Sequence, residues 1–297
     1  MSYPFEDEVL ALTEATRVAK TAGTAFQVNA LLDEQHGRAK TDLQTPVEII
    51  DTDTFPSIDD LYSEVRKWYR MRNVVAVSVD LKNSTALSVK DRYAQTSARL
   101  YEAATGSAVR LVTKFAPQFI DIQGDGLFAL FHGERSFERA FCAGTTIKTF
   151  SELSLEPLIE QNFGKEFPDT GFKVGMASGV LVAKKVGVRG TNEPVWAGKP
   201  VNYAVKCGSK ADRHELIATS SVYDKLADND YVTHSCGCST GGIPTPLWTD
   251  TQVEKLGKHS SCKVLRTRWC EIHGNEFCAA ILEGKRHRDE VSGQLAA

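Results

Sequence analysis

The chain has 297 residues, of which 42% are hydrophobic and 25% charged, and its net charge is −3. These values are typical of a globular protein and exclude collagen-like, low-complexity and disordered classes. The slight negative charge argues against a protein whose main task is to bind nucleic acid or an anionic membrane surface.

The first part of the chain predicts helices, a linker and a further helix. Its acidic start resembles neither a secretory signal nor a transit peptide, and no apolar run reaches the roughly 18 residues of a membrane helix, so we expect a cytoplasmic protein. Residues 6–40 lack proline and favour one or two helices, whereas the polar stretch 41–57 is typical of a linker. Ser57 and Asp60 then form a capping-box pattern, and apolar residues at helical spacing through Tyr69 predict a helix.

Short strands and helices alternate from residue 74 onward. The β-branched run 74–80 predicts a buried strand that ends at Asp80. Two apolar runs flank Gln123-Gly124-Asp125-Gly126, and an Asp-Gly pair in that position predicts a β-hairpin. The remaining expected elements are helices over about 90–115, 135–150 and 201–212, a strand over 172–182, a loop leading to Pro200, and a short helix from Ser220. This order predicts an α+β fold of the ferredoxin or palm type.

The seven cysteines occur at irregular spacing in a long chain, which does not indicate a disulfide framework. We expect most of them to be buried thiols. One group near the C-terminus offers the ligands of a structural zinc site, although its spacing matches no usual zinc pattern. That group consists of Cys236, Cys238, Cys262 and Cys270, with His234 and His273 nearby.

Asp80 and Asp125 are candidate metal ligands. Each lies at the end of a predicted strand, and neighbouring strand ends bring such side chains close together. Two carboxylates at short range repel each other unless a cation lies between them. Mg²⁺ and Mn²⁺ prefer oxygen ligands, and a two-metal site of this kind catalyses phosphoryl displacement. The alternative interpretation is that both residues only stabilise turns.

A polar loop and a basic helix face are candidate substrate contacts. The loop after Asp80, with Asn83, Ser84 and Thr85, can direct backbone N–H groups at a polyphosphate. On the helix predicted after Pro200, an amide and several cations recur along one face: Asn202, Lys206, Lys210 and Arg213. An amide and a cation one turn apart can hold a ribose oxygen and an α-phosphate oxygen; the alternative is a solvated basic face.

Three segments together resemble the motifs of class III nucleotidyl cyclases. Asp80–Thr85 resembles the first metal loop of that family, and Gln123–Gly126 resembles its second metal hairpin. Gly198–Lys206 resembles its Gly-x-x-Val-Asn-x-Ala-x-Arg helix, with Lys206 in place of the arginine. The resemblance covers roughly residues 70–230. Lysine lacks the forked guanidinium group, so Lys210 or Arg213 is an alternative phosphate ligand.

The resemblance implies a head-to-tail homodimer with active sites between the subunits. One subunit would hold two Mg²⁺ or Mn²⁺ ions with Asp80, Leu81 and Asp125. The other would supply Asn202 to orient the ribose of a nucleoside triphosphate and Lys206 to stabilise the α-phosphate. The expected products are a 3′,5′-cyclic nucleotide and pyrophosphate.

Asp121 and Val195 occupy the positions at which adenylate cyclases carry a lysine and an aspartate that read adenine. An acid and an apolar residue do not match the N1 and N6 groups of adenine, which argues against ATP. Asp121 suits the imide N–H of uracil, so UTP is favoured, followed by CTP and GTP. The layout resembles the pyrimidine cyclases of bacterial Pycsar antiphage systems, which implies a second messenger read by a separate effector.

The sequence also indicates a domain organisation and leaves one alternative function open. The expected domains are an N-terminal helical segment and linker (1–57), a cyclase core (58–230) and a C-terminal extension that completes the sheet (231–297). The alternative function is a catalytically degenerate cyclase fold kept as a binding or dimerisation module. Such a module would be expected to lose a metal carboxylate, and this chain keeps both Asp80 and Asp125.

Overall fold

The computed structural model describes residues 27–62, 66–84, 93–164, 169–186 and 193–292. The chain divides into two compact units, residues 1–48 and 49–297. The described part of the first unit is helix α2 (Val28–Gln44), which has no buried side chain. The helix prediction over 6–40 is therefore met in its second half, while residues 6–26 lie outside the described ranges. The second unit contains both the predicted core and the predicted C-terminal extension.

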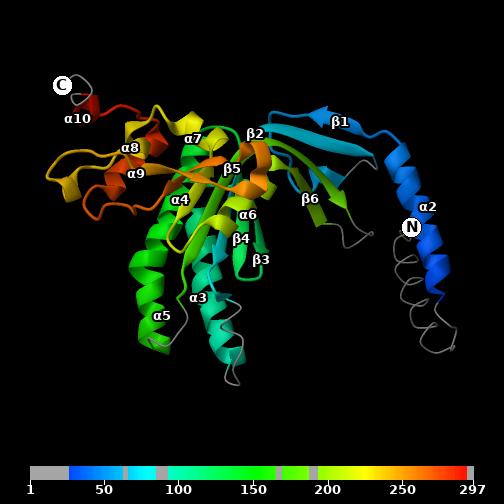
Figure 1. Cartoon of the computed structure of the whole chain (residues 1–297). Coiled ribbons are helices and arrows are strands. Elements are labelled where there is room, and N and C mark those ends of the chain that lie inside the picture. Colours follow the sequence, from blue (N-terminus) through cyan, green and yellow to red (C-terminus); the bar gives the residue numbers. More distant parts are fainter. Residues whose placement is uncertain (1–26, 63–65, 85–92, 165–168, 187–192, 293–297) are drawn as a thin grey trace, which may run out of the picture. The chain divides into compact units, whose positions relative to one another are not determined.

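The described residues of the second unit form a mostly antiparallel sheet of nine strands, in which seven follow the order β3-β4-β2-β5-β7-β9-β8 (Figure 1). Strand β1 pairs with β2, and β6 pairs with β5. Only β5 and β7 run parallel among the described strand pairs on the main path. The strands are β1 (Glu48–Asp51), β2 (Lys67–Leu81), β3 (Phe119–Gln123), β4 (Gly126–Phe131), β5 (Phe172–Val186), β6 (Glu193–Gly198), β7 (Leu216–Thr219), β8 (Trp248–Gln252) and β9 (Ser261–Leu265).

Helices cover both faces of this sheet. Alternate side chains of β2 point to opposite sides and enter a different hydrophobic core on each side. Val75, Val77 and Val79 pack into a large core, whereas Val74 and Ala76 pack into a second core with Ala204. The large core receives side chains from α3 (Tyr93–Thr113), α4 (Ser136–Phe150) and α7 (Ser220–Leu226), and the second core receives them from α6 (Lys199–Lys210). The remaining helices are α5 (Glu156–Phe163), α8 (Asp230–Thr233), α9 (Gly274–Glu283) and α10 (Asp289–Ser292). The predicted α+β class is confirmed.

The helix predicted after Ser57 is wrong. The capping interactions form, since Ser57 N–H donates to Asp60 Oδ2 over 3.1 Å and Asp60 N–H donates to Ser57 Oγ over 3.1 Å. They open only a short 3-10 turn, and strand β2 begins at Lys67. Tyr69, which the helical spacing included, pairs with Ala183 of β5. This pairing between residues far apart in sequence overrides the local periodicity.

Two strands lie in segments for which the sequence predicts loops. Strand β1 lies within the expected linker, and β6 lies in the expected loop before Pro200. Strand β6 carries Pro194, which favours an edge position and weakens the strand signal. Its residue Trp196 packs on Phe119 of β3, with ring centroids 4.7 Å apart. Strand β6 thus brings the segment that contains Val195 near the strand that contains Asp121.

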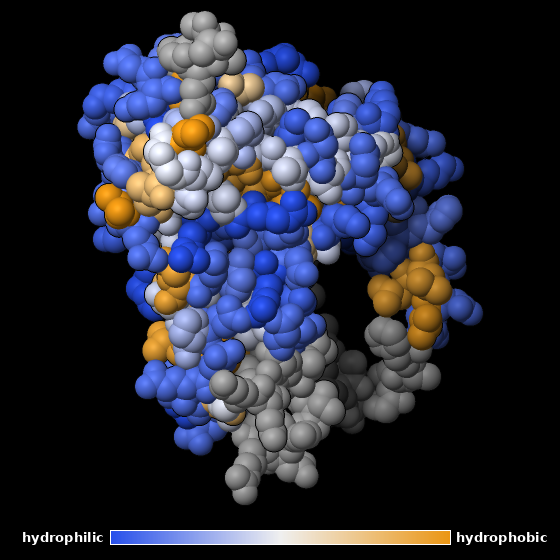
Figure 2. Space-filling view, turned by 60° about the vertical axis from the view of Figure 1, so that its left-hand side comes forward, coloured by the Kyte–Doolittle hydropathy of each residue, from blue (hydrophilic) through white to orange (hydrophobic). Residues whose placement is uncertain are grey.

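The C-terminal residues extend the sheet and pack on the core. Strands β9 and β8 follow β7, and Trp248 of β8 lies 6.0 Å from Phe141 of α4 between ring centroids. The face shown in Figure 2 is mostly hydrophilic, with scattered hydrophobic patches. Ile272 is the most exposed large hydrophobic side chain of the described C-terminal residues, at 74%. Within the described ranges, none of the helices is both long and apolar enough to cross a membrane.

Candidate active site

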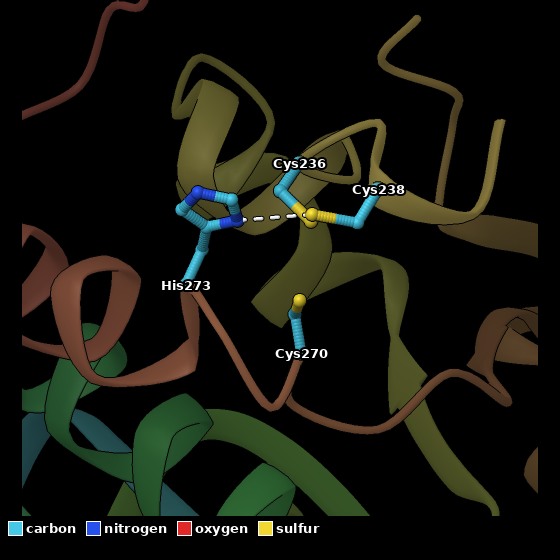
Figure 3. A group of neighbouring side chains, drawn as sticks. All are labelled: Cys236, Cys238, Cys270 and His273. Atoms are coloured by element: carbon cyan, nitrogen blue, oxygen red, sulfur yellow. Dashed lines mark hydrogen bonds between the residues drawn. The ribbon is translucent and has the colours of Figure 1, made fainter. Parts of the chain in front are cut away.

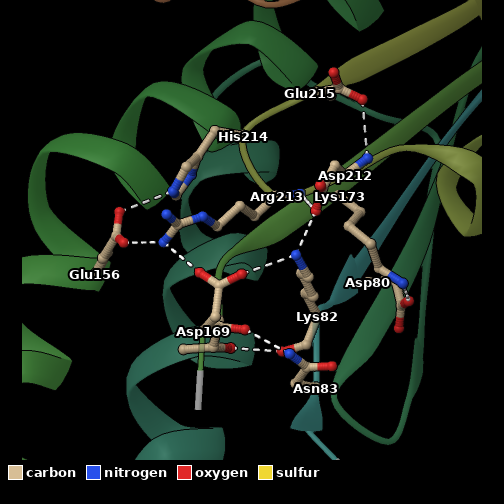
Figure 4. A network of polar contacts seen from close by, with 11 residues as sticks. Asp80, Lys82, Asn83, Glu156, Asp169, Lys173, Asp212, Arg213, His214 and Glu215 are labelled. Carbon is tan, nitrogen blue, oxygen red and sulfur yellow. Dashed lines mark hydrogen bonds and ion pairs between the residues drawn. The ribbon is translucent and has the colours of Figure 1, made fainter. Parts of the chain in front are cut away.

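Asp80 lies near the end of β2 and is neutralised by a cation from the next strand. Lys173 of β5 is its cross-strand partner, and Lys173 Nζ lies 2.6 Å from Asp80 Oδ2 (Figure 4). The side chain of Asp80 is 42% exposed and that of Lys173 only 17%. The ammonium group therefore supplies positive charge at the place where the sequence predicts a metal ion. Lys173 carries no motif signal and was not among the predicted site residues.

The hairpin that carries Asp125 packs against the end of β2. The hairpin prediction is confirmed, but its central residues are Gly124 and Asp125, because Gln123 pairs directly with Gly126. A Cβ atom at Gly126 would lie 2.5 Å from the carbonyl oxygen of Val79, a separation that side chains essentially never adopt. Only glycine permits this approach. The segment with Asp125 is thereby held against the backbone that leads into Asp80.

One carboxylate oxygen of Asp125 is buried without a partner. Asp125 Oδ2 makes no hydrogen bond among the described residues, although burying an unsatisfied polar group costs about 1–3 kcal/mol. Burial raises the pKa of Tyr101 on α3, and the negative charge of Asp125 raises it further, which places this phenol near the carboxylate. A divalent cation would satisfy such an oxygen. The donor set of Asp80, Asp125 and the Leu81 carbonyl contains the oxygen ligands that Mg²⁺ and Mn²⁺ prefer.

A small groove lies between the end of β2, the hairpin and α6. Its volume is about 170 Å³, and its lining includes Asp80, Gln123, Val205 and Ser209. Pockets that enclose a small-molecule ligand usually measure about 300–1,000 Å³. The described residues of one chain therefore provide only part of the enclosure that a nucleoside triphosphate needs.

Helix α6 presents a polar face away from the sheet. Ala204 and Cys207 are buried, whereas Asn202 and Lys210 are exposed and Lys206 is half-buried. Lys206 Nζ donates to the carbonyl of Lys255 over 3.1 Å and lies 5.6 Å from the ring centroid of Tyr203. The helix thus holds Asn202 and Lys206 one turn apart on an accessible surface, as the sequence predicts.

Arg213 does not lie on this helix face. Helix α6 ends at Lys210, two residues earlier than predicted, and the chain is extended at Ala211. The guanidinium of Arg213 is ion-paired with Glu156 and lies 2.6 Å from Asp169 Oδ1 (Figure 4). With two carboxylates bound, Arg213 is a structural residue, and we no longer expect it to replace the family arginine.

The loop after Asp80 is fastened by an ion-pair network that the sequence did not reveal. Lys82 Nζ lies 2.9 Å from Asp169 and 2.6 Å from Asp212, and the hydrogen bonds that Lys82 donates to these two carboxylates raise its pKa, with Asp212 contributing most. Asn83 Nδ2 donates to the carbonyl of Asp169 over 2.7 Å. Asn83 and Lys82 therefore shape the loop. Ser84 follows them in this loop, and the predicted substrate contact Thr85 lies outside the described residues.

The two predicted base-reading residues come from β3 and β6. Asp121 is half-buried and accepts a hydrogen bond from Gln123 Nε2 over 2.9 Å. Val195 is 37% exposed on β6. Their neighbours Phe119 and Trp196 are in contact, so the two strands meet on one side of the sheet.

The structure brings together three of the four cysteines that the sequence suggests as zinc ligands. Cys262 lies on β9, is 1% exposed and forms a hydrogen-bonded thiol pair with Cys207. Cys236, Cys238 and Cys270 do gather, and the fourth member of their group is His273 (Figure 3). His234 instead contacts the hydroxyl of Thr233 through Nδ1 over 3.0 Å.

Comparison with solved structures identifies the fold. The chain superposes on the adenylyl cyclase CyaB from P. aeruginosa with a TM-score of 0.54 over 67% of this chain and 95% of that one, at 14% sequence identity. No protein-family profile matches the chain. The chain thus has the fold of a class III cyclase catalytic domain.

Sequence relatives then define the family. The chain is 44% identical to the uridylate cyclase of Micromonospora echinofusca, over 91% of this chain and 89% of the relative. It is 42% identical to the uridylate cyclase of Propioniciclava tarda, over 88% and 86%. This protein belongs to the uridylate cyclase family.

Proposed function

We propose that the protein converts UTP into 3′,5′-cyclic UMP and pyrophosphate. The observation that carries the proposal is the placement of Asp125 on a hairpin held against the strand that carries Asp80, with a buried oxygen that has no hydrogen-bond partner among the described residues. A purely structural aspartate would be expected to find a hydrogen-bond donor. The names of the two bacterial relatives support uridine as the nucleoside.

Asp80, Asp125 and the carbonyl of Leu81 would hold Mg²⁺ or Mn²⁺. Bound divalent ions would lower the pKa of the 3′-hydroxyl and stabilise charge on the leaving pyrophosphate. Asp80 must exchange its ion pair with Lys173 for this role. The displaced ammonium then stays close enough to the site to contact the negatively charged triphosphate.

We propose that a homodimer completes each active site. The groove beside Asp80 is too small for a nucleotide, and Asn202 and Lys206 stand on a surface directed away from the sheet of their own chain. In a head-to-tail pair, Asn202 of one subunit would orient the ribose bound by the other. Lys206 would approach the α-phosphate as a point charge, without the two-pronged contact of an arginine.

We propose that Asp121 selects the base. Its carboxylate accepts hydrogen bonds only, so it suits the N3–H of uracil and repels the N3 acceptor of cytosine. The hydrogen bond from Gln123 fixes one of its oxygens in place. Val195 offers no polar group to the second edge of a purine, which disfavours GTP. The product would act as an antiphage second messenger read by a separate effector, a role for which the family resemblance is the support.

The test is an assay of the purified protein with each of the four ribonucleoside triphosphates and Mn²⁺. We expect cyclic UMP and stoichiometric pyrophosphate from UTP, with kcat/KM at least about tenfold above that for CTP, GTP or ATP, because one hydrogen bond to a charged group is worth about 1.5–3 kcal/mol. Cyclic CMP or cyclic GMP as the main product would overturn the base assignment. No product from any nucleotide would indicate the degenerate binding module instead.

A further inference from the structure

A second group of metal-ligand side chains lies in the C-terminal part of the chain. The sulfur atoms of Cys236, Cys238 and Cys270 and a ring nitrogen of His273 all lie within 4.8 Å of one another (Figure 3). Cys238 Sγ and His273 Nδ1 are 3.1 Å apart. The cysteines are not joined in disulfides. Three thiols and an imidazole therefore face one small volume.

This spacing fits a tetrahedral zinc ion. Zinc binds sulfur at about 2.3 Å and nitrogen at about 2.0 Å, so the corners of its coordination tetrahedron are roughly 3.5–3.8 Å apart. The observed limit of 4.8 Å requires side-chain shifts of about an ångström or less to reach that geometry. Three cysteines and one histidine fill all four positions, which is the arrangement of structural zinc sites and leaves no open position for substrate.

The backbone around the cysteines is built to hold them in place. Gly237, between Cys236 and Cys238, has a φ of 82°, and a Cβ atom there would lie 2.6 Å from the backbone of Gly242. Only glycine allows this tight turn, which lets the sulfur atoms of Cys236 and Cys238 lie in the same group. On the second segment, the N–H of Gly274 donates to the carbonyl of Cys270 over 2.8 Å, which fixes the turn between Cys270 and His273.

The two segments that meet here are anchored to different parts of the fold. The segment before Cys270 is fixed to α4, because the buried Lys148 donates to the carbonyls of Arg266 and Thr267 over 2.9 and 2.7 Å. The segment with Cys236 is fixed near the C-terminus, where Arg288 donates to the carbonyl of Ser235 over 2.9 Å. Both segments border a cavity of about 580 Å³. A bond between them would close one wall of that cavity.

We propose that Cys236, Cys238, Cys270 and His273 bind one zinc ion, which joins the loop after α8 to the segment between β9 and α9. The ion would neutralise part of the charge of three thiolates and protect the exposed Cys238 from oxidation. It would also stabilise the C-terminal part of the sheet, since β9 continues directly into the ligand segment. This role is independent of the catalytic ions and of the proposed reaction.

The test is the metal content of the intact protein after purification without chelator, measured by mass spectrometry of the metal. We expect about one zinc per chain in the wild type and at least a tenfold loss in Cys238→Ser and His273→Ala. Cys278→Ser and Cys262→Ala are the controls, because each removes a thiol outside the group, and both should keep the metal. Cobalt substitution of the wild type should give the absorption of tetrahedral, thiolate-bound Co²⁺.

Several results would overturn the zinc site. A wild-type protein that stays metal-free after reconstitution with zinc under reducing conditions contradicts it directly. Metal retained by His273→Ala but lost by Cys262→Ala would show a different ligand set. If Cys238→Ser fails to fold, thermal unfolding of the wild type is measured with and without a strong chelator instead. An unchanged unfolding midpoint would then reject a stabilising metal ion. None of these measurements requires cyclase activity.

Discussion

Replacing Asp125 by asparagine should lower kcat for cyclic UMP formation by about 10³-fold or more, because an amide cannot supply the charge that holds a divalent ion. Asp80→Asn should have an effect of the same size. The buried oxygen of Asp125 has no partner among the described residues, so its substitution breaks no hydrogen bond seen there. We therefore expect Asp125→Asn to keep its thermal unfolding midpoint within a few degrees.

Asp250→Asn is the matched control for Asp80→Asn. Asp250 and Lys263 are cross-strand partners on β8 and β9 with 2.8 Å between their charged groups, just as Asp80 and Lys173 are on β2 and β5. The Asp250→Asn variant loses an Asp–Lys ion pair of the same type, but this pair does not lie on the hairpin that carries Asp125 or on the strands next to it. It should keep nearly full activity. Cyclic UMP produced by Asp80→Asn or Asp125→Asn at the wild-type rate would refute the metal assignment.

Mixing two inactive variants should restore activity if the active sites lie between subunits. Asp80→Asn damages the half of the site that binds metal, and Asn202→Ala damages the half that orients the ribose. In a mixed dimer one site receives both lesions and the other receives none. Random pairing then gives about a quarter of the wild-type activity, since about half of the dimers are mixed and each has one intact site.

The control for this experiment mixes Asp80→Asn with Asp125→Asn. Both lesions fall in the same half-site, so each site of a mixed dimer carries one of them and no activity should return. The two chains are co-expressed with different tags, and mixed dimers are isolated through both tags. Isolated mixed dimers of Asp80→Asn and Asn202→Ala that remain inactive would contradict the shared active site. Recovery in both mixtures would show that the lesions do not act as assigned.

Local sequence signals predicted well the elements that carry the candidate site residues. The β-branched run before Asp80 and the Gly-Asp-Gly turn at Asp125 each specify their structure within a few residues, so the strand end and the hairpin form as expected. The contact between them follows from Gly126, whose lack of a side chain admits the backbone of Val79. The helix with Asn202 was also predictable from local sequence, because its polar residues recur at helical spacing.

Contacts between distant segments could not be predicted in the same way. Tyr69 belongs to a strand because it meets Ala183, and no local pattern reports that pairing. Lys173 neutralises Asp80 from the adjacent strand, although the two residues are far apart in the sequence. His273, and not Cys262, joins the three clustered cysteines, because the turn after Cys270 brings its imidazole ring toward Cys238. In each case the partner was set by the tertiary fold.

We propose that Asp80 and Asp125 together bind divalent ions beside a triphosphate. The decisive experiment is anomalous diffraction from crystals grown with Mn²⁺ and 3′-deoxy-UTP, which lacks the attacking hydroxyl. We expect manganese density in contact with both carboxylates, and Lys173 released from Asp80. Manganese density elsewhere, with the Asp80–Lys173 pair intact and Asp125 Oδ2 still without a ligand, would contradict it.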